Sequence, residues 1–236
     1  MRKTKWLASG LLMLNVFSLN AMKKESSIIY TEDLNQLSVV LFDSDIEDQE
    51  QLFGGVQRLN NLLFDAVKTK LLVKTERLLA LGAEVNATDE SGRTPMHYAA
   101  GLDNIDIVKL LEKNDGWLDI SDGYGGTPLH WAAMKNALQV INYFVQKEIN
   151  LDDELKNGET PLLLALKRRA LPAAILLINS GADINHIDHK GRTPLYWAVF
   201  LKSKEITQLL LSKEVKLGRE NGKLNPTKAE IQKLLK

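Results

Sequence analysis

Four histidines are the side chains best suited to acid–base chemistry in this 236-residue chain, which contains no cysteine. His97 and His130 each end a Thr-Pro-x-His tetrapeptide, but two equivalent Thr-Pro motifs carry Leu163 and Tyr196 at that position. A shared catalytic role could not survive those replacements. The pattern instead favours buried, hydrogen-bonded histidines with a structural role.

The other two histidines, His186 and His189, lie on either side of Asp188 and are the only candidate metal ligands. The neighbouring Asn185 adds a weak amide ligand, and the spacing suits neither a rigid helical pair nor a zinc pattern. We therefore expect no metal site. The sequence also lacks a nucleophile elbow, a phosphate-binding glycine loop and a kinase-type signature, so we expect no enzyme and no cofactor.

The Thr-Pro motifs recur every 33 residues through three successive intervals. A period held without insertion indicates one supersecondary unit copied in tandem. Threonine suits the N-cap of a helix, and proline suits its first position, where a missing N–H costs nothing. A glycine that allows positive φ precedes each motif, and a small alanine follows it. The motifs begin at Thr94, Thr127, Thr160 and Thr193, after Gly92, Gly125, Gly158 and Gly191 and before Ala99, Ala132, Ala165 and Ala198.

The repeated text resembles the ankyrin repeat over roughly residues 59–218. The matching segments are "DESGRTPMHYAA", "DGYGGTPLHWAA", "NGETPLLLAL" and "DHKGRTPLYWAV", and the unit endings "LLALGAEVN" and "LLINSGADIN" fit as well. The resemblance implies an all-α solenoid of about five units, each with a β-turn finger, an inner helix and an outer helix. It also implies that His97 and His130 bond the motif threonine and the backbone of the adjoining turn.

The two ends of the array depart from the pattern. Asn61 and Leu62 replace Thr-Pro in the first unit, so we expect its finger to be lost. Residues 219–236 form a basic tail, and Pro226 to Leu235 reads as an amphipathic helix. Both departures suit the ends of a solenoid, whose outer faces must meet water.

Two internal positions also vary between units. Leu155 replaces the aspartate that begins the other fingers, which removes one side-chain acceptor from that turn. After the inner helix the family usually has glycine, which adopts positive φ without strain. This chain has other residues there. Asp and Asn tolerate positive φ, whereas Arg and Lys adopt it at some cost. These residues are Asp103, Asn136, Arg169 and Lys202.

The first 21 residues read as a secretory signal peptide. Three of the first five residues are basic, residues 6–19 are mostly apolar, and Ala21 offers a cleavage site. We expect cleavage there and an exported, periplasmic or secreted protein. An uncleaved membrane anchor and a buried structural helix are the alternatives. Residues 22–58 are expected to form an acidic linker with a leading helix.

The charge balance gives no indication of nucleic-acid binding. The chain has 30 basic and 30 acidic residues, so its formal net charge is zero and nothing favours nucleic acid as a partner. The absence of cysteine does not assign a redox compartment, because a repeat core needs no disulfide.

The inner helices are where a partner protein is expected to bind. In the family, the residue after the fourth motif position faces the concave groove. Two interpretations stay open for these side chains: they pack on one another and stiffen the stack, or they form a contact stripe. Helix ends and finger tips, Glu159 among them, extend this surface. The predicted partner-binding residues are Tyr98, Trp131, Trp197, Tyr124, Met134, Lys167, Arg168, Phe200, Arg93 and Arg192.

The sequence thus predicts a monomeric, non-catalytic module that binds a partner protein through the concave face of an ankyrin stack. A rigid, extended surface lowers the ordering cost of binding. The alternatives are a structural or stabilising exported module without a dedicated partner, and a host-directed secreted factor of a host-associated bacterium. Contact with a membrane is expected only if the N-terminal segment stays attached as an anchor.

Overall fold

A computed structural model describes residues 49–213, 215 and 226–236, and all of its regular elements in these ranges are α-helices. The chain divides into two units, Met1–Gly55 and Val56–Lys236, and the second contains the repeats. No helix within the described ranges is both long and apolar enough to cross a membrane. The helices are α3 (Gln49–Lys68), α4 (Leu72–Ala80), α5 (Pro95–Gly101), α6 (Ile105–Lys113), α7 (Pro128–Lys135), α8 (Leu138–Gln146), α9 (Pro161–Lys167), α10 (Leu171–Asn179), α11 (Pro194–Phe200), α12 (Lys204–Ser212) and α13 (Lys228–Leu235).

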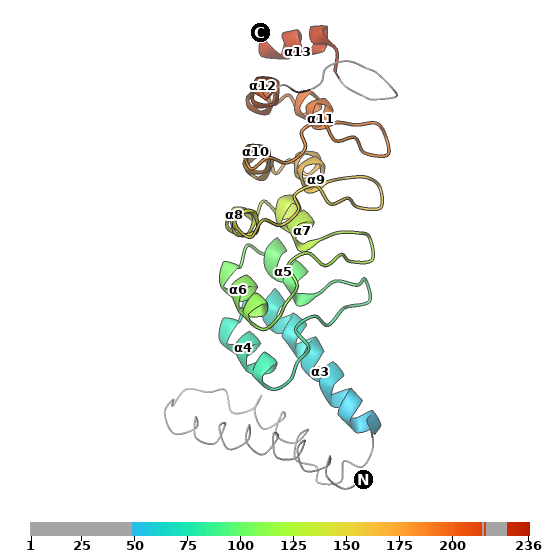
Figure 1. Ribbon diagram of the computed structural model, residues 1–236, viewed down its shortest axis with the longest axis vertical. Helices are drawn as coiled ribbons and strands as arrows, with labels where there is room; N and C mark the ends of the chain where they lie inside the picture. The colour runs from blue at the N-terminus through green and yellow to red at the C-terminus, as the bar shows by residue number, and fades with distance from the viewer. Residues whose placement is uncertain (1–48, 214, 216–225) are drawn as a thin grey trace. The chain divides into compact units, whose positions relative to one another are not determined.

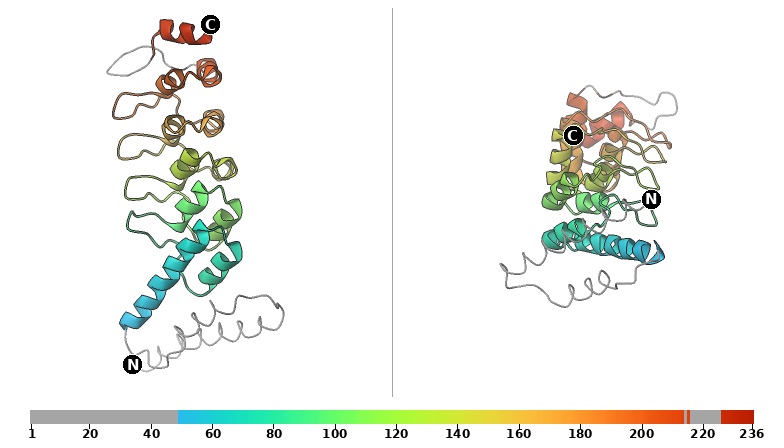
Figure 2. Two further views of the ribbon diagram at one scale, coloured as in Figure 1. Left: turned by 180° about the vertical axis from the view of Figure 1, so that it is seen from behind. Right: turned by 60° about the horizontal axis from the view of Figure 1, so that its bottom comes forward.

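The helices from α5 to α12 form a regular two-layer stack (Figure 1). The inner helices α5, α7, α9 and α11 lie in one row, and the outer helices α6, α8, α10 and α12 lie in the other. Loops project beyond the inner row as parallel fingers (Figures 1 and 2). The predicted all-α ankyrin solenoid is therefore confirmed.

Small side chains allow the inner helices to pack closely. The alanine after each motif is completely buried, and large apolar side chains such as Leu129, Leu162 and Phe144 fill the space between the two rows. Each inner helix begins as the motif predicts, with threonine at the N-cap and proline at the first position. The buried alanines are Ala99, Ala132, Ala165 and Ala198.

A residue in the left-handed conformation follows each inner helix within two residues. Asp103, Asn136, Arg169 and Lys202 have φ between 53° and 61°, as expected for positions where the family has glycine. Two of these side chains also reach the next unit. Asp103 Oδ1 accepts a hydrogen bond from Val140 N–H, and Asn136 Oδ1 accepts one from Ala173 N–H, both at 3.0 Å.

These two contacts explain why a side chain is useful at the turn. Val140 lies in the first turn of α8 and Ala173 in the first turn of α10, where N–H groups lack intrahelical partners. The turn of one unit therefore caps the outer helix of the next. The outer helix α12 instead uses its own Ser203, whose hydroxyl accepts from Ile206 N–H.

The fingers are held by aspartate side chains and by backbone bonds between neighbours. Asp89, Asp122 and Asp188 each accept two backbone N–H groups within their own finger. Where Leu155 removes this acceptor, Asn157 accepts Glu159 N–H at 3.1 Å instead. Backbone N–H groups of Gly123, Lys156 and His189 donate to carbonyl oxygens of the preceding finger, at Ser91, Tyr124 and Asn157.

The ends of the stack differ from its interior. Helix α3 runs without a break through Asn61 and Leu62, where the first unit lacks Thr-Pro, so no finger forms there. At the other end α13 packs against α11 and α12 and buries Ile231. The predicted signal peptide, the linker before residue 49 and residues 219–225 of the tail lie outside the described residues.

Candidate protein-binding surface

The motif histidines link one repeat to the next. His97 Nδ1 accepts the backbone N–H of Thr94 at 3.0 Å, and the Thr94 hydroxyl lies 2.9 Å from the same nitrogen. The opposite ring nitrogen, Nε2, lies 2.9 Å from the carbonyl oxygen of Gly126 in the next unit. Because a carbonyl oxygen only accepts, Nε2 must carry the proton and the ring is held in one neutral tautomer.

His130 makes the same link one unit further on. Its Nδ1 accepts Thr127 N–H at 3.1 Å, and its Nε2 donates to the carbonyl oxygen of Glu159 at 3.2 Å. Both histidines are buried, and burial lowers the pKa of each imidazole below its ordinary value by disfavouring the charged form. The structural role expected for the two residues matches these contacts, and neither ring is free to exchange protons with a ligand.

Aromatic side chains on the inner helices touch across the first three units. The ring of Tyr98 lies 5.8 Å from that of Phe64 and 5.6 Å from that of Trp131, centroid to centroid. Lys68 extends over the rings of Phe64 and Tyr98. These contacts join α3, α5 and α7, so this part of the aromatic row packs between repeats.

Trp131 is fixed from several sides. Its indole N–H donates to Asp122 Oδ2 at 3.2 Å, and the Arg93 guanidinium lies 4.9 Å from its ring. The Trp131 ring also packs closely on Gly101, the last residue of α5, where an added Cβ would lie 3.4 Å from Trp131 Cε3. Only the half-buried face that these neighbours leave uncovered remains for a partner.

Buried charges replace the histidine link at the junction between the fourth and fifth units. Glu159 is 1% exposed, and its Oε1 accepts bonds from Lys167 at 2.6 Å and from Arg192 at 3.1 Å. Arg192 also donates to Asp188 Oδ2 through Nε, at 2.6 Å. Here Leu163 stands where a histidine would be, so the Glu159–Arg192 contact joins the fourth unit to the fifth.

A second aromatic cluster lies on the last inner helix. The rings of Tyr196 and Phe200 are nearly parallel with centroids 6.1 Å apart, and Trp197 meets both edge-on. Phe200 is 64% exposed. The Arg192 guanidinium covers the Trp197 ring at 4.9 Å. This cluster presents a rigid aromatic surface to the solvent.

The remaining predicted binding residues lie along the same surface. Tyr124 is 63% exposed at a finger tip, Arg168 is exposed at the end of α9, and Met134 is half-buried near the end of α7. We call the surface of the fingers and inner helices the inner face. Arg93, Lys167 and Arg192 belong to it but are engaged with other side chains of the stack.

The buried state of Glu159 was not evident from the sequence, which places this residue at a finger tip. Two features of the sequence could have indicated it. Leu163 replaces the motif histidine, and two cations, Lys167 and Arg192, lie in the same and the next unit. Where a junction lacks the histidine hydrogen bond but has one acidic and two basic residues nearby, an ion pair is expected to replace that bond.

A family profile described as ankyrin repeats in three copies matches residues 63–154 and 145–221. The chain belongs to the ankyrin-repeat family. It is 35% identical over 79 residues to inversin of Danio rerio and 35% identical over 83 residues to inversin of Gallus gallus. These matches cover 34% and 35% of this chain, which spans only 7% of the length of each inversin.

Ankyrin repeats are generally non-catalytic modules for protein–protein interaction. The described residues contain no group of three or more acidic, histidine or cysteine side chains arranged to hold a metal ion. The Nε2 atom of His186, considered above as a metal ligand, lies 3.0 Å from the carbonyl oxygen of Gly158 and 3.6 Å from Glu154 Oε1.

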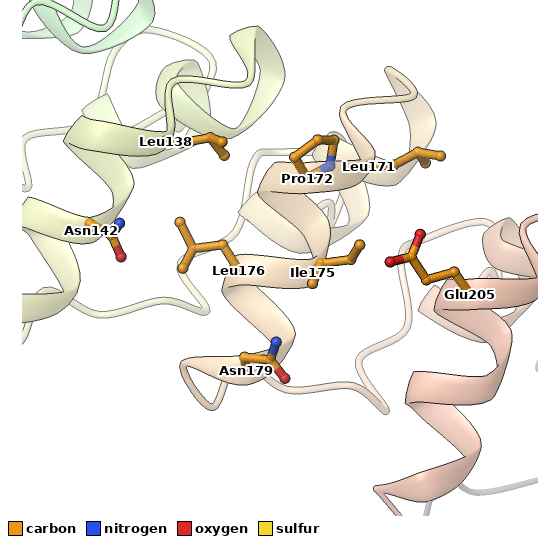
Figure 3. Close-up of a pocket in the computed structure, with 8 residues that line it drawn as sticks. All are labelled: Leu138, Asn142, Leu171, Pro172, Ile175, Leu176, Asn179 and Glu205. Carbon is orange, nitrogen blue, oxygen red and sulfur yellow. The ribbon is translucent and has the colours of Figure 1, made fainter.

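The outer helices carry one further surface feature, a shallow groove along α8, α10 and α12 (Figure 3). It is mainly apolar because α8 and α10 contain no charged residue. Its position on the outer row separates it from the inner face (Figure 1). The lining side chains are Leu138, Asn142, Leu171, Pro172, Ile175, Leu176, Asn179 and Glu205.

Proposed function

We propose that this ankyrin stack is a non-catalytic module that binds a partner protein through its inner, concave face. The observation that carries the proposal is the exposed aromatic cluster of Tyr196, Trp197 and Phe200. Phe200 leaves 64% of its surface open to solvent although its ring is held against two others. A large aromatic group fixed in place before binding loses little freedom when a partner covers it.

The fixed geometry of the inner face supports the same proposal. Its helices are joined by buried histidines, by the Glu159 contacts and by finger-to-finger backbone bonds. A surface locked in this way presents side chains from several repeats to one extended partner segment. Trp131 contributes mainly to this rigidity, whereas Phe200 and Tyr124 offer area that nothing else in the described part of the chain covers.

Site-specific photo-cross-linking tests the binding face. A photoreactive phenylalanine analogue at position 200, in the full chain expressed in its own cell, should give a discrete cross-linked protein. The matched control is the same analogue at Trp117, which is 55% exposed on the connection after α6, where its backbone N–H donates to Asn86 Oδ1. Cross-links from position 117 with none from position 200 would place the partner elsewhere.

A second experiment measures the energetic role of Phe200. Once the cross-linked partner is identified, Phe200→Ala should weaken its binding at least tenfold, since truncation of a central aromatic residue typically costs about 2 kcal/mol. The denaturation midpoint should stay close to that of the parent because the ring is largely exposed. Unchanged affinity in a folded variant would show that the aromatic cluster is not part of the interface.

We further propose that the protein acts outside the cytoplasm after loss of its first 21 residues. The basic start, the apolar stretch of residues 6–19 and Ala21 support this proposal. The intact mass of protein purified from its own cell decides the question. A full-length mass together with pelleting in the membrane fraction would favour the anchored alternative.

A further inference from the structure

Four cations lie at the C-terminal ends of three successive inner helices. Lys135 is the last residue of α7, Arg168 and Arg169 follow α9, and Lys202 follows α11. All four side chains are exposed. Helices α7, α9 and α11 are successive neighbours in the stack (Figure 1). We call the four residues at the ends of these helices the basic edge.

The basic edge has little acidic compensation within the described ranges. None of its members takes part in the salt bridges there, which involve Lys147, Lys167, His186 and Arg192. The outer helices α8 and α10 begin beside this row without an acidic residue in the first turn, although acidic groups are favoured at that place. Glu205, in the first turn of α12, is the exception.

Helix electrostatics account for part of this arrangement, because cations near a helix C-terminus stabilise it. They do not account for Arg169 and Lys202, which lie beyond the helix in left-handed conformations with φ of 61° and 56°. Glycine would adopt that conformation without strain, whereas a residue with a Cβ does so at a cost. Lys70, at the equivalent turn after α3, donates from Nζ to the carbonyl oxygen of Leu102 in the next unit, whereas the described residues provide no such partner for Arg169 or Lys202.

The spacing of the row specifies what it fits. Packed helices lie about 8–10 Å apart, so the C-terminal ends of α7, α9 and α11, from which these cations extend, are expected to be spaced by about that distance. An extended polyproline-II segment rises about 3.1 Å per residue and returns to the same face every third residue, after about 9 Å. One acidic side chain at every third residue would therefore meet one inner helix each.

We propose that the basic edge binds an acidic, extended segment of the partner protein that carries an acidic side chain at every third residue. This proposal rests on partner binding at the inner face and adds the chemistry of the partner. The acidic side chains meet Lys135, Arg168 with Arg169, and Lys202. Side chains on the other faces of the segment meet the aromatic surface around Phe200.

Two synthetic peptides of identical composition test the spacing directly. Each has twelve residues, with four glutamates and eight proline, leucine or alanine residues. In one peptide the glutamates occupy every third position, and in the other they are consecutive. Fluorescence anisotropy with the full chain should show saturable binding of the first peptide at least tenfold tighter than of the second, and weaker binding at high salt.

Matched charge reversals assign the binding to the basic edge. Arg168→Glu should weaken binding of the regularly spaced peptide at least tenfold. Lys113→Glu is the control, because Lys113 is also exposed and also ends a helix, α6, in the outer row. The control should bind within twofold of the parent, and circular dichroism should show that both variants are folded.

The outcomes separate this inference from the proposed function. Equal binding of the two peptides, or equal effects of Arg168→Glu and Lys113→Glu, would overturn the basic edge as a spaced acidic-segment site. Tighter binding of a single-stranded DNA oligonucleotide or of phosphatidylglycerol vesicles than of either peptide would overturn it in favour of a general polyanion surface. Cross-linking from position 200 would still support protein binding in each of these cases.

Discussion

The Nε2 atom of His130 lies 3.2 Å from the carbonyl oxygen of Glu159, and this contact marks a change in how the repeats are joined. Up to this point, histidines link the second unit to the third and the third to the fourth through a carbonyl oxygen. After it, the side chain of Glu159 itself binds Arg192 of the following unit. Glu159 thus accepts the hydrogen bond of the neutral His130 through its backbone and forms the ion pair with Arg192 through its side chain.

Replacing His130 by leucine should lower stability at neutral pH and reduce its dependence on pH. The chain itself uses leucine at the equivalent position, Leu163. The substitution leaves Thr127 N–H and the Glu159 carbonyl without this partner, so we expect a cost of about 1–2 kcal/mol at pH 7.5. Denaturant unfolding, followed by circular dichroism, measures it.

The pH dependence follows from the lowered pKa of the buried imidazoles. His97 and His130 stay neutral in the fold, whereas unfolded histidine titrates near 6.5. Their neutral contacts are fully present above that pH. As pH falls below it toward the folded-state pKa, unfolding takes up protons and the free energy of unfolding declines. The decline between pH 7.5 and 5.5 should be smaller in His130→Leu, and an equal decline would contradict this assignment.

Glu159→Gln should destabilise the junction between the last two units. It removes the charge that holds Lys167 and Arg192, whose side chains are 34% and 15% exposed. Loss of one partner of a buried pair costs about 3–5 kcal/mol, and partial exposure of these cations reduces the expected value to about 2 kcal/mol. Glu154→Gln, at a 51% exposed side chain just before the finger of the fourth unit, is the control and should change stability by under about 0.5 kcal/mol.

Two substitutions at Asn136 separate its two roles. Asn136→Gly keeps the left-handed turn and loses only the bond to Ala173 N–H, so it should cost about 1 kcal/mol or less. Asn136→Ala loses the bond and also places a Cβ at φ of 59°, so it should cost about 1 kcal/mol more. Equal denaturation midpoints for the two variants would show that the conformation carries no penalty here.

Gly92→Ala should be much more destabilising than Gly82→Ala. Both glycines have positive φ, 75° and 97°, so both variants carry the conformational cost of alanine there. At Gly92 the new Cβ would also lie 2.9 Å from the backbone nitrogen of Gly123 in the next finger, whereas at Gly82 nothing lies within 4 Å. We expect the collision to add about 1–3 kcal/mol. Thermal unfolding of the two variants side by side measures the difference, and similar midpoints would mean that the fingers separate without cost.

The sequence by itself determined the repeat architecture. A period of 33 residues, with threonine at the N-cap, proline next to it and alanine in the interior, leaves one way for each unit to bury its apolar residues, which is against a copy of itself. The structural role of His97 and His130 followed as well, because the same position holds Leu163 and Tyr196 in other units. Because these features repeat, comparing equivalent positions within the sequence is enough to infer the role of each residue type.

Only the tertiary structure decided how the exceptions to the repeat are used. Glu159, Lys167 and Arg192 are separated in sequence and meet because the fourth and fifth units stack. The same stacking turns Tyr98 and Trp131 into packing contacts, while Phe200, near the end of the last inner helix, remains exposed. Whether an aromatic side chain stiffens the array or faces a partner depends on which neighbour covers it, and that is set by contacts between units.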